Sequence, residues 1–442
     1  MKPGIVRVPG VAVILAVTLW AAWPGLYPPP APGFVPPPVS VPAALGEAPR
    51  LFSTLISGTH SRNVHAASLA ERSDGRLFAV WFGGTDEGSA DVRIYGAEGV
   101  PAAGGHTLWD EPKAVVSREE TEKSQKRWVR KLGNPVVFAD SRRSLWLAHV
   151  SATMGGWASS RLNLLRLSET PPASRRLVTS PFFNMSTLAK GPPVLFDNGD
   201  IGLPVYHELA GKFAELLVLT PEGEARRKIR MDHGQRTLQP VLLVEDAQRA
   251  IALMRDASDD SLRVWRSETA DAGRSWSEPR PTDLHNPNSA LAALRLDDGR
   301  LLAVANDTED QRLRLSLLVS EDRGHRWRVV HRFEDRQARY AEAMPKAAFR
   351  ALLSADLAAL APARTAAADI VAAVIGNLCE RDRCQWQYDY PYLIRAGDGD
   401  FHLVYTWNRS FIRYVRFNAA WLRERLGESL GESLGKSLGE AA

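Results

Sequence analysis

The sequence is poor in cysteine: 442 residues contain only two, Cys379 and Cys384. A disulfide framework or a cysteine-based metal cluster therefore cannot organise the fold. In an oxidising compartment the two could close a small loop as a disulfide, with two free thiols as the alternative. A G-x-x-x-x-G-K-S/T phosphate loop and an H-E-x-x-H helix are also missing, so nucleotide enzymes and zinc proteases have no support. We expect no cofactor and no metal.

The chain also lacks a large excess of positive or negative charge, and it has few long hydrophobic runs. The chain has 55 Lys and Arg against 51 Asp and Glu, a net charge of +4, with no basic run of the kind that binds nucleic acid. One apolar run, Val11 to Trp23, follows Lys2 and Arg7 and has the length of a signal-peptide core. Trp23-Pro24 interrupts the expected cleavage region, so residues 1–27 are either a signal peptide or a membrane anchor. We expect an exported, periplasmic protein, held at the inner membrane if the segment is retained.

Three further segments differ in composition from the rest of the chain. Residues 28–49 are rich in proline and predict an extended linker. Residues 337–375 are rich in Ala and Leu, which favours a small helical insertion. Residues 423–442 repeat Leu-Gly-Glu-Ser, and we expect a disordered tail. The main domain is then expected at 50–422.

One sequence pattern recurs along the chain: an apolar run, a turn at Asp or Gly, and a second apolar run. Such a pattern is typical of a β-hairpin, because Gly adopts positive φ without steric cost. Six copies occur, beginning near His65, Asn134, Pro192, Gln239, Asn288 and Tyr388. Where no insertion intervenes they recur about every 50 residues, the length of a four-stranded propeller blade. The expected fold is all-β, a six-bladed β-propeller with the helical insertion between blades five and six. We expect a monomer.

Two of the repeats carry the same turn motif. It reads Thr269-x-Asp271-x-Gly273-x-x-Trp276 in one copy and Ser320-x-Asp322-x-Gly324-x-x-Trp327 in the next. The short polar side chains can bond the turn backbone, and Trp can pack on the sheet. These motifs resemble the Asp-box of the sialidase (neuraminidase) superfamily, in which the box is structural.

The chain further resembles bacterial predicted neuraminidases with a BNR-repeat-like domain, from about residue 55 to 420. The matching stretches are His65-Ala-Ala-Ser, Trp81-Phe-Gly-Gly-Thr-Asp86-Glu-Gly, Gln239-Pro240, Leu253-Met-Arg255, Asn286-Pro-Asn-Ser289 and Tyr390-Pro391. The resemblance implies a sialidase-like propeller that hydrolyses a glycosidic bond, with sialic acid as the default substrate. It also implies a tyrosine nucleophile, an aspartic general acid and arginines that bind the substrate carboxylate.

Propeller geometry and the resemblance together suggest the site residues. The first strand of each blade lines the central channel, so polar residues at strand ends should converge at one mouth. Tyr388 matches the nucleophile, with Tyr390 and Tyr392 as competitors, and Asp86 matches the acid, with Glu87 and Asp91 beside it. Arg255 and Arg312 fit two carboxylate-binding positions. The remaining expected substrate-binding residues are His65, Asn134, Gln239, Asn288 and Arg409.

Two positions depart from the sialidase pattern. His65 stands where the first carboxylate-binding arginine is expected, and Gln239 stands where a glutamate should deprotonate the tyrosine. Glu208 or Asp389 could take over as the base. The expected function is a sialidase-like, exo-acting glycoside hydrolase on sialic acid or another acidic or modified sugar. The alternative is a propeller that has lost catalysis and binds a glycan or exopolysaccharide, and in both cases the expected partner is carbohydrate.

Overall fold

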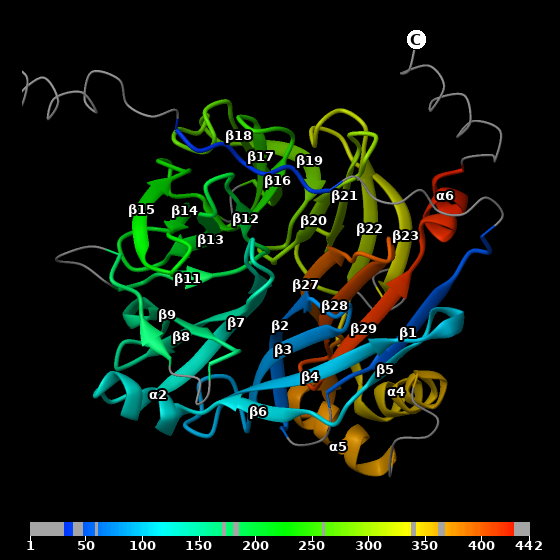
Figure 1. Cartoon of the computed structure of the whole chain (residues 1–442). Coiled ribbons are helices and arrows are strands. Elements are labelled where there is room, and N and C mark those ends of the chain that lie inside the picture. Colours follow the sequence, from blue (N-terminus) through cyan, green and yellow to red (C-terminus); the bar gives the residue numbers. More distant parts are fainter. Residues whose placement is uncertain are drawn as a thin grey trace, which may run out of the picture.

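The computed structural model describes residues 31–38, 47–57, 61–169, 174–179, 185–258, 261–336, 342–360 and 367–427. The expected export segment, residues 1–27, lies outside them, and so does the expected tail from residue 428 onward. Most of the described chain forms six antiparallel sheets, each built mainly from consecutive strands (Figure 1).

The first three sheets follow one another along the chain. Sheet one contains β2 (Asn63–Glu71), β3 (Leu77–Gly84), β4 (Arg93–Pro101), β5 (Thr107–Trp109) and β6 (Lys113–Val116). Sheet two contains β7 (Lys131–Ala139), β8 (Leu145–Ala152), β9 (Arg161–Arg166) and β10 (Arg175–Arg176). Sheet three contains β11 (Leu188–Ala189), β12 (Val194–Leu195), β13 (Ile201–His207), β14 (Phe213–Leu219) and β15 (Ala225–Arg230). Between sheets one and two lies helix α2 (Arg118–Gln125), and two short 3-10 turns are η1 (Ala103–Gly105) and η2 (Gly156–Ser159).

The last three sheets repeat the pattern. Sheet four contains β16 (Thr237–Val244), β17 (Ala250–Asp256), β18 (Arg263–Thr269) and β19 (Arg280–His285). Sheet five contains β20 (Ala292–Arg295), β21 (Leu301–Ala305), β22 (Arg314–Ser320) and β23 (Arg328–Asp335). Sheet six contains β27 (Tyr388–Arg395), β28 (Phe401–Trp407), β29 (Phe411–Phe417) and β1 (Leu51–Leu55). The first described strand of the domain thus completes the last sheet.

The leading strands of the sheets lie in the middle of the molecule and contact one another in order (Figure 1). Strand β2 contacts β7, which contacts β11 of sheet three; β13 of that sheet contacts β16, β16 contacts β20, β20 contacts β27, and β27 returns to β2. Strands β2, β7 and β16 are almost wholly buried because apolar neighbours cover both of their faces. Every sheet therefore directs the start of its leading strand toward the same central region.

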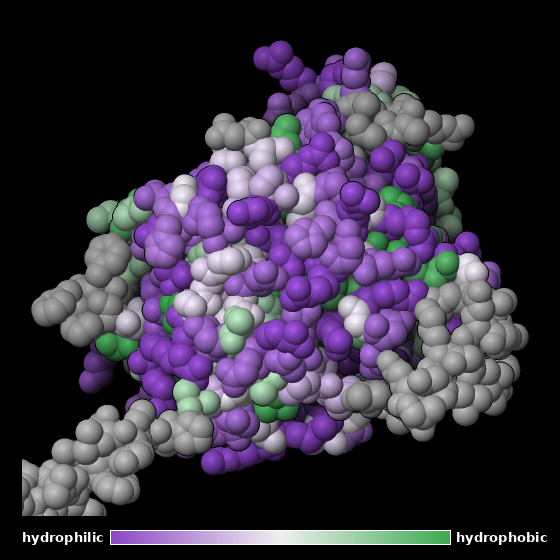
Figure 2. All heavy atoms as spheres, turned by 90° about the horizontal axis from the view of Figure 1, so that it is seen from above, coloured by the Kyte–Doolittle hydropathy of each residue, from purple (hydrophilic) through white to green (hydrophobic). Residues whose placement is uncertain are grey.

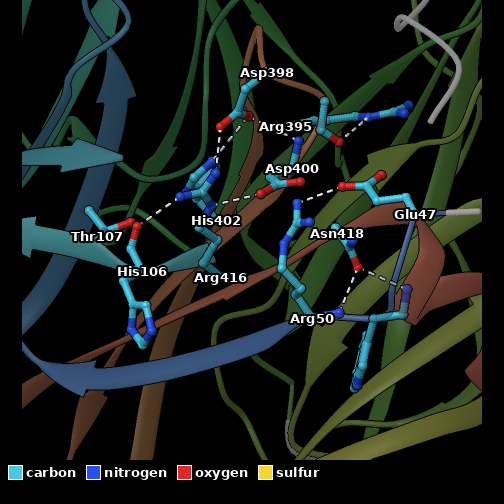
Figure 3. A network of polar contacts seen from close by, with 12 residues as sticks. Glu47, Arg50, His106, Thr107, Arg395, Asp398, Asp400, His402, Arg416 and Asn418 are labelled. Atoms are coloured by element: carbon cyan, nitrogen blue, oxygen red, sulfur yellow. Dashed lines mark hydrogen bonds and ion pairs between the residues drawn. The ribbon is translucent and has the colours of Figure 1, made fainter. Parts of the chain in front are cut away.

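The two ends of the domain are joined by polar contacts as well as by the β1–β29 pairing (Figure 3). Asn418 caps helix α6 (Ala419–Leu426) by accepting a bond from Trp421 N, and its Oδ1 also accepts from Arg50 N. Arg416 donates to Asp400 at 2.7 Å and to Asp398 at 3.0 Å. Its third bond goes to the carbonyl of His106 in sheet one. This network fixes sheet six against sheet one.

The insertion between sheets five and six consists of two helices and a small sheet. Helix α4 (Lys346–Leu360) buries Phe349, Leu353 and Leu357, a four-residue spacing that places them on one helix face. Helix α5 (Ala367–Leu378) packs against α4, and β24 (Met344–Pro345) pairs with β26 (Arg383–Cys384). A disulfide joins Cys379 of β25 (Cys379–Glu380) to Cys384 of β26. The helices thus extend to Leu378, three residues beyond the expected insertion.

Two segment boundaries differ from the expectation. Phe34, in the proline-rich stretch, is 2% exposed and packs against Phe196 with ring centroids 5.0 Å apart. Residues 31–38 are therefore docked on sheets three and four rather than extended away from the domain. At the other end, α6 includes residues 423–426, because Asn418 starts the helix and Gly427, at φ 81°, ends it.

Figure 2 shows a face that is mostly hydrophilic outside the grey atoms, with small, scattered hydrophobic residues. Among the described residues, no helix has the length and apolar character needed to cross a membrane.

Candidate active site

The leading segments of all six sheets contain one residue with positive φ at an equivalent place. These residues are Ala66, Asn134, Gly191, Gln239, Asn288 and Tyr390, with φ values of 52°, 44°, 91°, 50°, 49° and 52°. Positive φ is uncommon for residues other than glycine and marks a local constraint. Because positive φ recurs at an equivalent position in all six sheets, it is a shared structural feature of the repeats.

In four sheets this residue coincides with a β-bulge. Three steps along β27, from Asp389 to Tyr392, match two steps along β28, and the same shift occurs in the β2–β3, β7–β8 and β16–β17 pairs. A bulge inserts one unpaired residue and redirects its side chain, which is why bulges are frequent beside active sites. The bulge residues Asn134, Gln239 and Tyr390, together with Asn288, all enter one hydrogen-bonded cluster.

Two tyrosines and two amides form one side of this cluster. Asn134 Nδ2 donates to the Tyr206 hydroxyl at 2.7 Å, and Gln239 Nε2 donates to the same oxygen at 3.2 Å. Gln239 Nε2 also lies 3.3 Å from the hydroxyl of Tyr390. Tyr206 is buried, and its burial raises its pKa well above the ordinary value, so it remains a neutral phenol. Tyr390 is partly exposed.

Two arginines form the other side. Arg255 Nε donates to Asn288 Oδ1 at 2.7 Å, and its Nη1 donates to Gln239 Oε1 at 3.1 Å. Arg312 Nη2 donates to the carbonyl oxygen of Asn288 at 2.7 Å. Both guanidinium groups therefore meet at Asn288. Planar guanidinium groups are well suited to bind a carboxylate through paired hydrogen bonds.

Arg312 is held in place by the buried carboxylate of Asp389. The Arg312 Nη1 to Asp389 Oδ1 distance is 2.6 Å, and Gln387 Nε2 donates to Asp389 Oδ2 at 2.5 Å. Burial alone would raise the pKa of Asp389, but the neighbouring Arg312 and His65 outweigh it and hold the pKa below its usual range. Asp389 is thus an ionised anchor that is bound to the arginine, and it is not free to act as a base.

His65 contacts the ring of Tyr390. Their ring centroids are 4.4 Å apart in an edge-on arrangement. The His65 side chain is 8% exposed, and Nδ1 is buried without a hydrogen-bond partner in the described part of the chain. Burial lowers the pKa of His65, with Asp389 acting in the opposite direction, so its imidazole is neutral at pH 7.

A buried lysine lies behind Tyr390. Lys190 immediately precedes Gly191, the positive-φ residue of sheet three, and its Nζ donates to the carbonyl of Pro391 at 3.0 Å. The ammonium group also lies 5.0 Å from the ring centroid of Tyr392. Burial lowers the pKa of Lys190 to about 7. The hydrogen bond from Lys190 to Pro391 therefore holds the bulge at Tyr390 in place. Burial of the charged ammonium group, by contrast, lowers the free energy of unfolding.

Replacing Lys190 with methionine is expected to raise the free energy of unfolding by about 2 kcal/mol near neutral pH. This net value includes the cost of losing the hydrogen bond to Pro391. The pKa of Lys190 is about 7 in the folded protein and 10.5 in the unfolded chain. At a pH between these two values, the lysine is protonated in the unfolded chain and mostly neutral in the folded protein. The cost of burying Lys190 is largest at and below pH ~7, and it disappears as the pH approaches the unfolded pKa. Urea unfolding at about pH 6.5 and about pH 9.5 measures this difference.

The exposed Lys113→Met is the matched control and should leave stability unchanged at both pH values. A Lys190→Met protein that is no more stable than wild type near neutral pH would contradict this account of the buried ammonium group.

The loop after β3 provides carboxylates at the edge of the cluster. Asp86 is exposed; Asn63 Nδ2 donates to its Oδ1 at 3.3 Å, and Arg409 lies 3.9 Å away. Glu87 acts electrostatically on His65 and on Arg312. Asp91 instead braces the loop, because its Oδ2 accepts bonds from both the backbone and the hydroxyl of Thr85.

Glu208 lies at the end of β13 on the Arg255 side of the cluster. Burial raises its pKa, and Arg255, Lys212 and Lys131 oppose that effect. Its backbone N–H donates to Ser186 Oγ. The described residues contain no group of three His, Cys, Asp or Glu side chains placed to hold a metal ion.

Comparison with known proteins identifies the family. The family described as the BNR repeat-like domain matches residues 75–403, well over half of the chain. The chain belongs to this family. No curated protein matches its sequence.

Solved structures show the same fold at low sequence identity. The Hadza microbial sialidase Hz136 is 14% identical with a TM-score of 0.58, and the match covers 82% of this chain and 68% of that one. An intramolecular trans-sialidase from Ruminococcus gnavus, in complex with oseltamivir carboxylate, is 11% identical with a TM-score of 0.54 over 84% and 98% of the chains. A protein of unknown function from Dyadobacter fermentans is 10% identical with a TM-score of 0.56 over 83% and 99%.

Both Asp-boxes of this BNR repeat-like chain close tight turns far from the cluster. Asp271 Oδ1 accepts bonds from the N–H groups of Arg274 and Ser275, and Gly273 N donates to Thr269 Oγ1. The second box repeats these contacts: Asp322 accepts from the N–H groups of His325 and Arg326, and Gly324 N donates to Ser320 Oγ. The tryptophans Trp276 and Trp327 pack against the sheets. These bonds brace the β18–β19 and β22–β23 connections.

Tyr388 is the one expected catalytic residue that the structure does not bring into the cluster. Its side chain is 0% exposed and packs in the core between sheets five and six, with the hydroxyl beside Arg336. Tyr390, named in the sequence only as a competitor, occupies the cluster instead. The other expected residues, His65, Asn134, Gln239, Arg255, Asn288 and Arg312, are joined there, with Asp86, Glu208 and Arg409 at its edge.

Lys190 was not among the expected site residues. For Tyr390, a sequence signal does exist: Pro follows the positive-φ residue in four of the six repeats, at Pro135, Pro192, Pro240 and Pro391. Aligning the copies on this proline would have separated Tyr390 from Tyr388.

Proposed function

We propose that the six sheets are the blades of a β-propeller and that the cluster at its centre is the active site of a glycoside hydrolase for an acidic sugar. Two features support the propeller: the leading strands contact one another in cyclic order, and β1 completes the last sheet. The observation that carries the function is the meeting of Arg255 and Arg312 at Asn288, next to the redirected Tyr390.

The two arginines provide the selectivity for an acid. Arg255 makes hydrogen bonds to neutral amide oxygens, so its positive charge is not neutralised in these contacts. Arg312 is neutralised in part by Asp389 but keeps a partly exposed side chain. A substrate carboxylate placed between them gains charge-assisted hydrogen bonds that a neutral sugar cannot make. The R. gnavus trans-sialidase complex, with its carboxylate-bearing ligand, is consistent with this assignment.

Tyr390 is the proposed nucleophile. A phenol is chosen over a carboxylate when the substrate is itself an anion, because two negative charges repel each other. Gln239 hydrogen-bonds the tyrosine but cannot accept its proton. We assign that step to the neutral imidazole of His65, which contacts the Tyr390 ring. As the phenolic oxygen forms its bond to the anomeric carbon, the proton passes to His65.

Asp86 is the proposed general acid. Asn63 and Arg409 fix its carboxyl at the edge of the cluster, and its exposed loop allows the departing group to leave toward solvent. Asp86 donates its proton to the glycosidic oxygen as the bond to the anomeric carbon breaks. A water molecule, deprotonated by Asp86, then displaces Tyr390 from the sugar. His65 returns its proton to the departing phenolate, so all three groups are regenerated.

Hydrolysis of a panel of fluorogenic glycosides tests this function. We expect release of the fluorophore from at least one acidic glycoside, such as a sialoside, glucuronide or galacturonide, and no comparable release from the neutral glucoside and galactoside. The second candidate, a non-catalytic glycan-binding propeller, is favoured by Gln239 in place of a base. Absence of turnover across the panel, together with carbohydrate binding that is unchanged in Tyr390→Phe, would establish that candidate instead.

A further inference from the structure

A large pocket opens beside the proposed active site, between the helical insertion and sheets five and six. Its volume is about 790 Å³, within the range typical of small-molecule sites. Arg312, Gln387 and Arg409 line it, and the same residues contact the site: Arg312 and Gln387 hold Asp389, and Arg409 lies beside Asp86. The pocket and the active site therefore share these three residues.

The far wall of the pocket is made by the hairpin of the insertion. Strands β25 and β26 pair Cys379 with Cys384 and Glu380 with Arg383, and the disulfide closes the same hairpin. Arg381 occupies its tip at φ 57° and, like Arg383, lines the pocket with an exposed side chain. The hairpin is thus a cross-linked element that contributes two arginines to the lining of the pocket.

The charge of the lining favours an anion. Four arginines, Arg312, Arg381, Arg383 and Arg409, face the pocket against two acids, Asp310 and Glu380. The wall also includes Trp386, which is 2% exposed.

We propose that this pocket binds a second, negatively charged sugar unit attached to the sugar in the active site. This inference rests on the proposed function and deepens it: the substrate is an acidic oligosaccharide or polysaccharide of at least two units, rather than a single acidic sugar on a neutral carrier. Arg381 and Arg383 bind the carboxylate of the second unit, and the disulfide keeps their hairpin positioned. Loss of the two arginines should therefore affect the longer ligand alone.

Titration calorimetry with matched ligands tests the proposal. The ligands are sialic acid and its α2,8-linked trimer, and galacturonic acid and trigalacturonic acid. All titrations use the Tyr390→Phe background, so that the trimer is not hydrolysed during the measurement. We expect one trimer to bind Tyr390→Phe at least about tenfold more tightly than its own monomer. In Arg381→Ala/Arg383→Ala that advantage should fall to within about threefold, while binding of the monomer is unchanged. The matched control is Arg142→Ala/Arg143→Ala, which removes the same charge from the exposed β7–β8 turn at the opposite end of sheet two.

The outcomes separate the two claims. Binding of a monomer with no additional affinity for its trimer would overturn the pocket assignment and leave the proposed function standing. A trimer advantage that survives in the hairpin variant, or that is lost equally in the control, would also overturn it. If neither acid binds at either length, the proposed function itself fails, and the inference that rests on it fails with it.

Discussion

Tyr390→Phe is expected to lower kcat for an acidic glycoside by roughly 10³-fold or more, because loss of a covalent nucleophile removes the low-energy route. Binding should change little, since Phe keeps the ring against His65 and loses only one long contact to Gln239 of 3.3 Å. The KM should therefore stay within a few-fold of wild type, as measured by steady-state kinetics on the best substrate of the panel.

Tyr388→Phe is the matched control, because it removes the same hydroxyl two residues away. That hydroxyl lies in the core beside Arg336, so the change should affect stability slightly and leave kcat within about twofold of wild type. A large loss of kcat in Tyr388→Phe with wild-type rates in Tyr390→Phe would reverse the assignment of the nucleophile.

Arg312→Ala is expected to destabilise the fold by about 3 kcal/mol as well as to abolish binding of the acid. The reason is Asp389, a carboxylate with 0% exposed side chain whose closest cationic partner is Arg312 at 2.6 Å. Without Arg312, the charge remains buried with only Gln387 and neutral His65 close by. Urea unfolding near neutral pH measures the change in the free energy of unfolding.

Combining Arg312→Ala with Asp389→Asn separates the two roles of the arginine. The double variant has no buried charge to leave unpaired, so most of the lost stability should return. Binding of the acidic sugar should not return, because the guanidinium group is still absent. A double variant as unstable as Arg312→Ala, or one that binds the acid normally, would contradict this division between anchoring and recognition.

The repeats and the site region were predictable from the sequence because they depend on local patterns. Apolar runs separated by Asp-Gly turns predicted the hairpins, and the repeat spacing predicted that Asn134, Gln239 and Asn288 would lie at equivalent places. In the first sheet the equivalent residue is Ala66, one position after the expected His65. Residue Arg255 lies next to the last residue of β17, and its contact with Gln239 follows from the β16–β17 pairing.

The choice between Tyr388 and Tyr390 was not predictable by strand periodicity. In a regular strand, residues two positions apart share one face, so Tyr388, Tyr390 and Tyr392 would be equivalent. The bulge at Tyr390 breaks that rule: Tyr388 packs in the core of sheets five and six, and Tyr392 packs in a different core cluster. The redirected side chain between them reaches the cluster.

The docking of Phe34 on sheets three and four and the placement of Arg381 and Arg312 in the lining of one pocket were also not predictable from the sequence. Each depends on contacts between segments far apart in the chain, for example between Phe34 and Phe196. Composition alone described these stretches as a linker and a helical insertion, with no indication of where they would pack.

The most direct test of the central claim is a crystal structure of Tyr390→Phe with the acidic sugar that the wild type releases from the panel. The account predicts that the sugar carboxylate lies within hydrogen-bonding distance of both Arg255 and Arg312, with the anomeric carbon facing ring position 390. A carboxylate bound by other cations, or a sugar located away from the cluster, would contradict it.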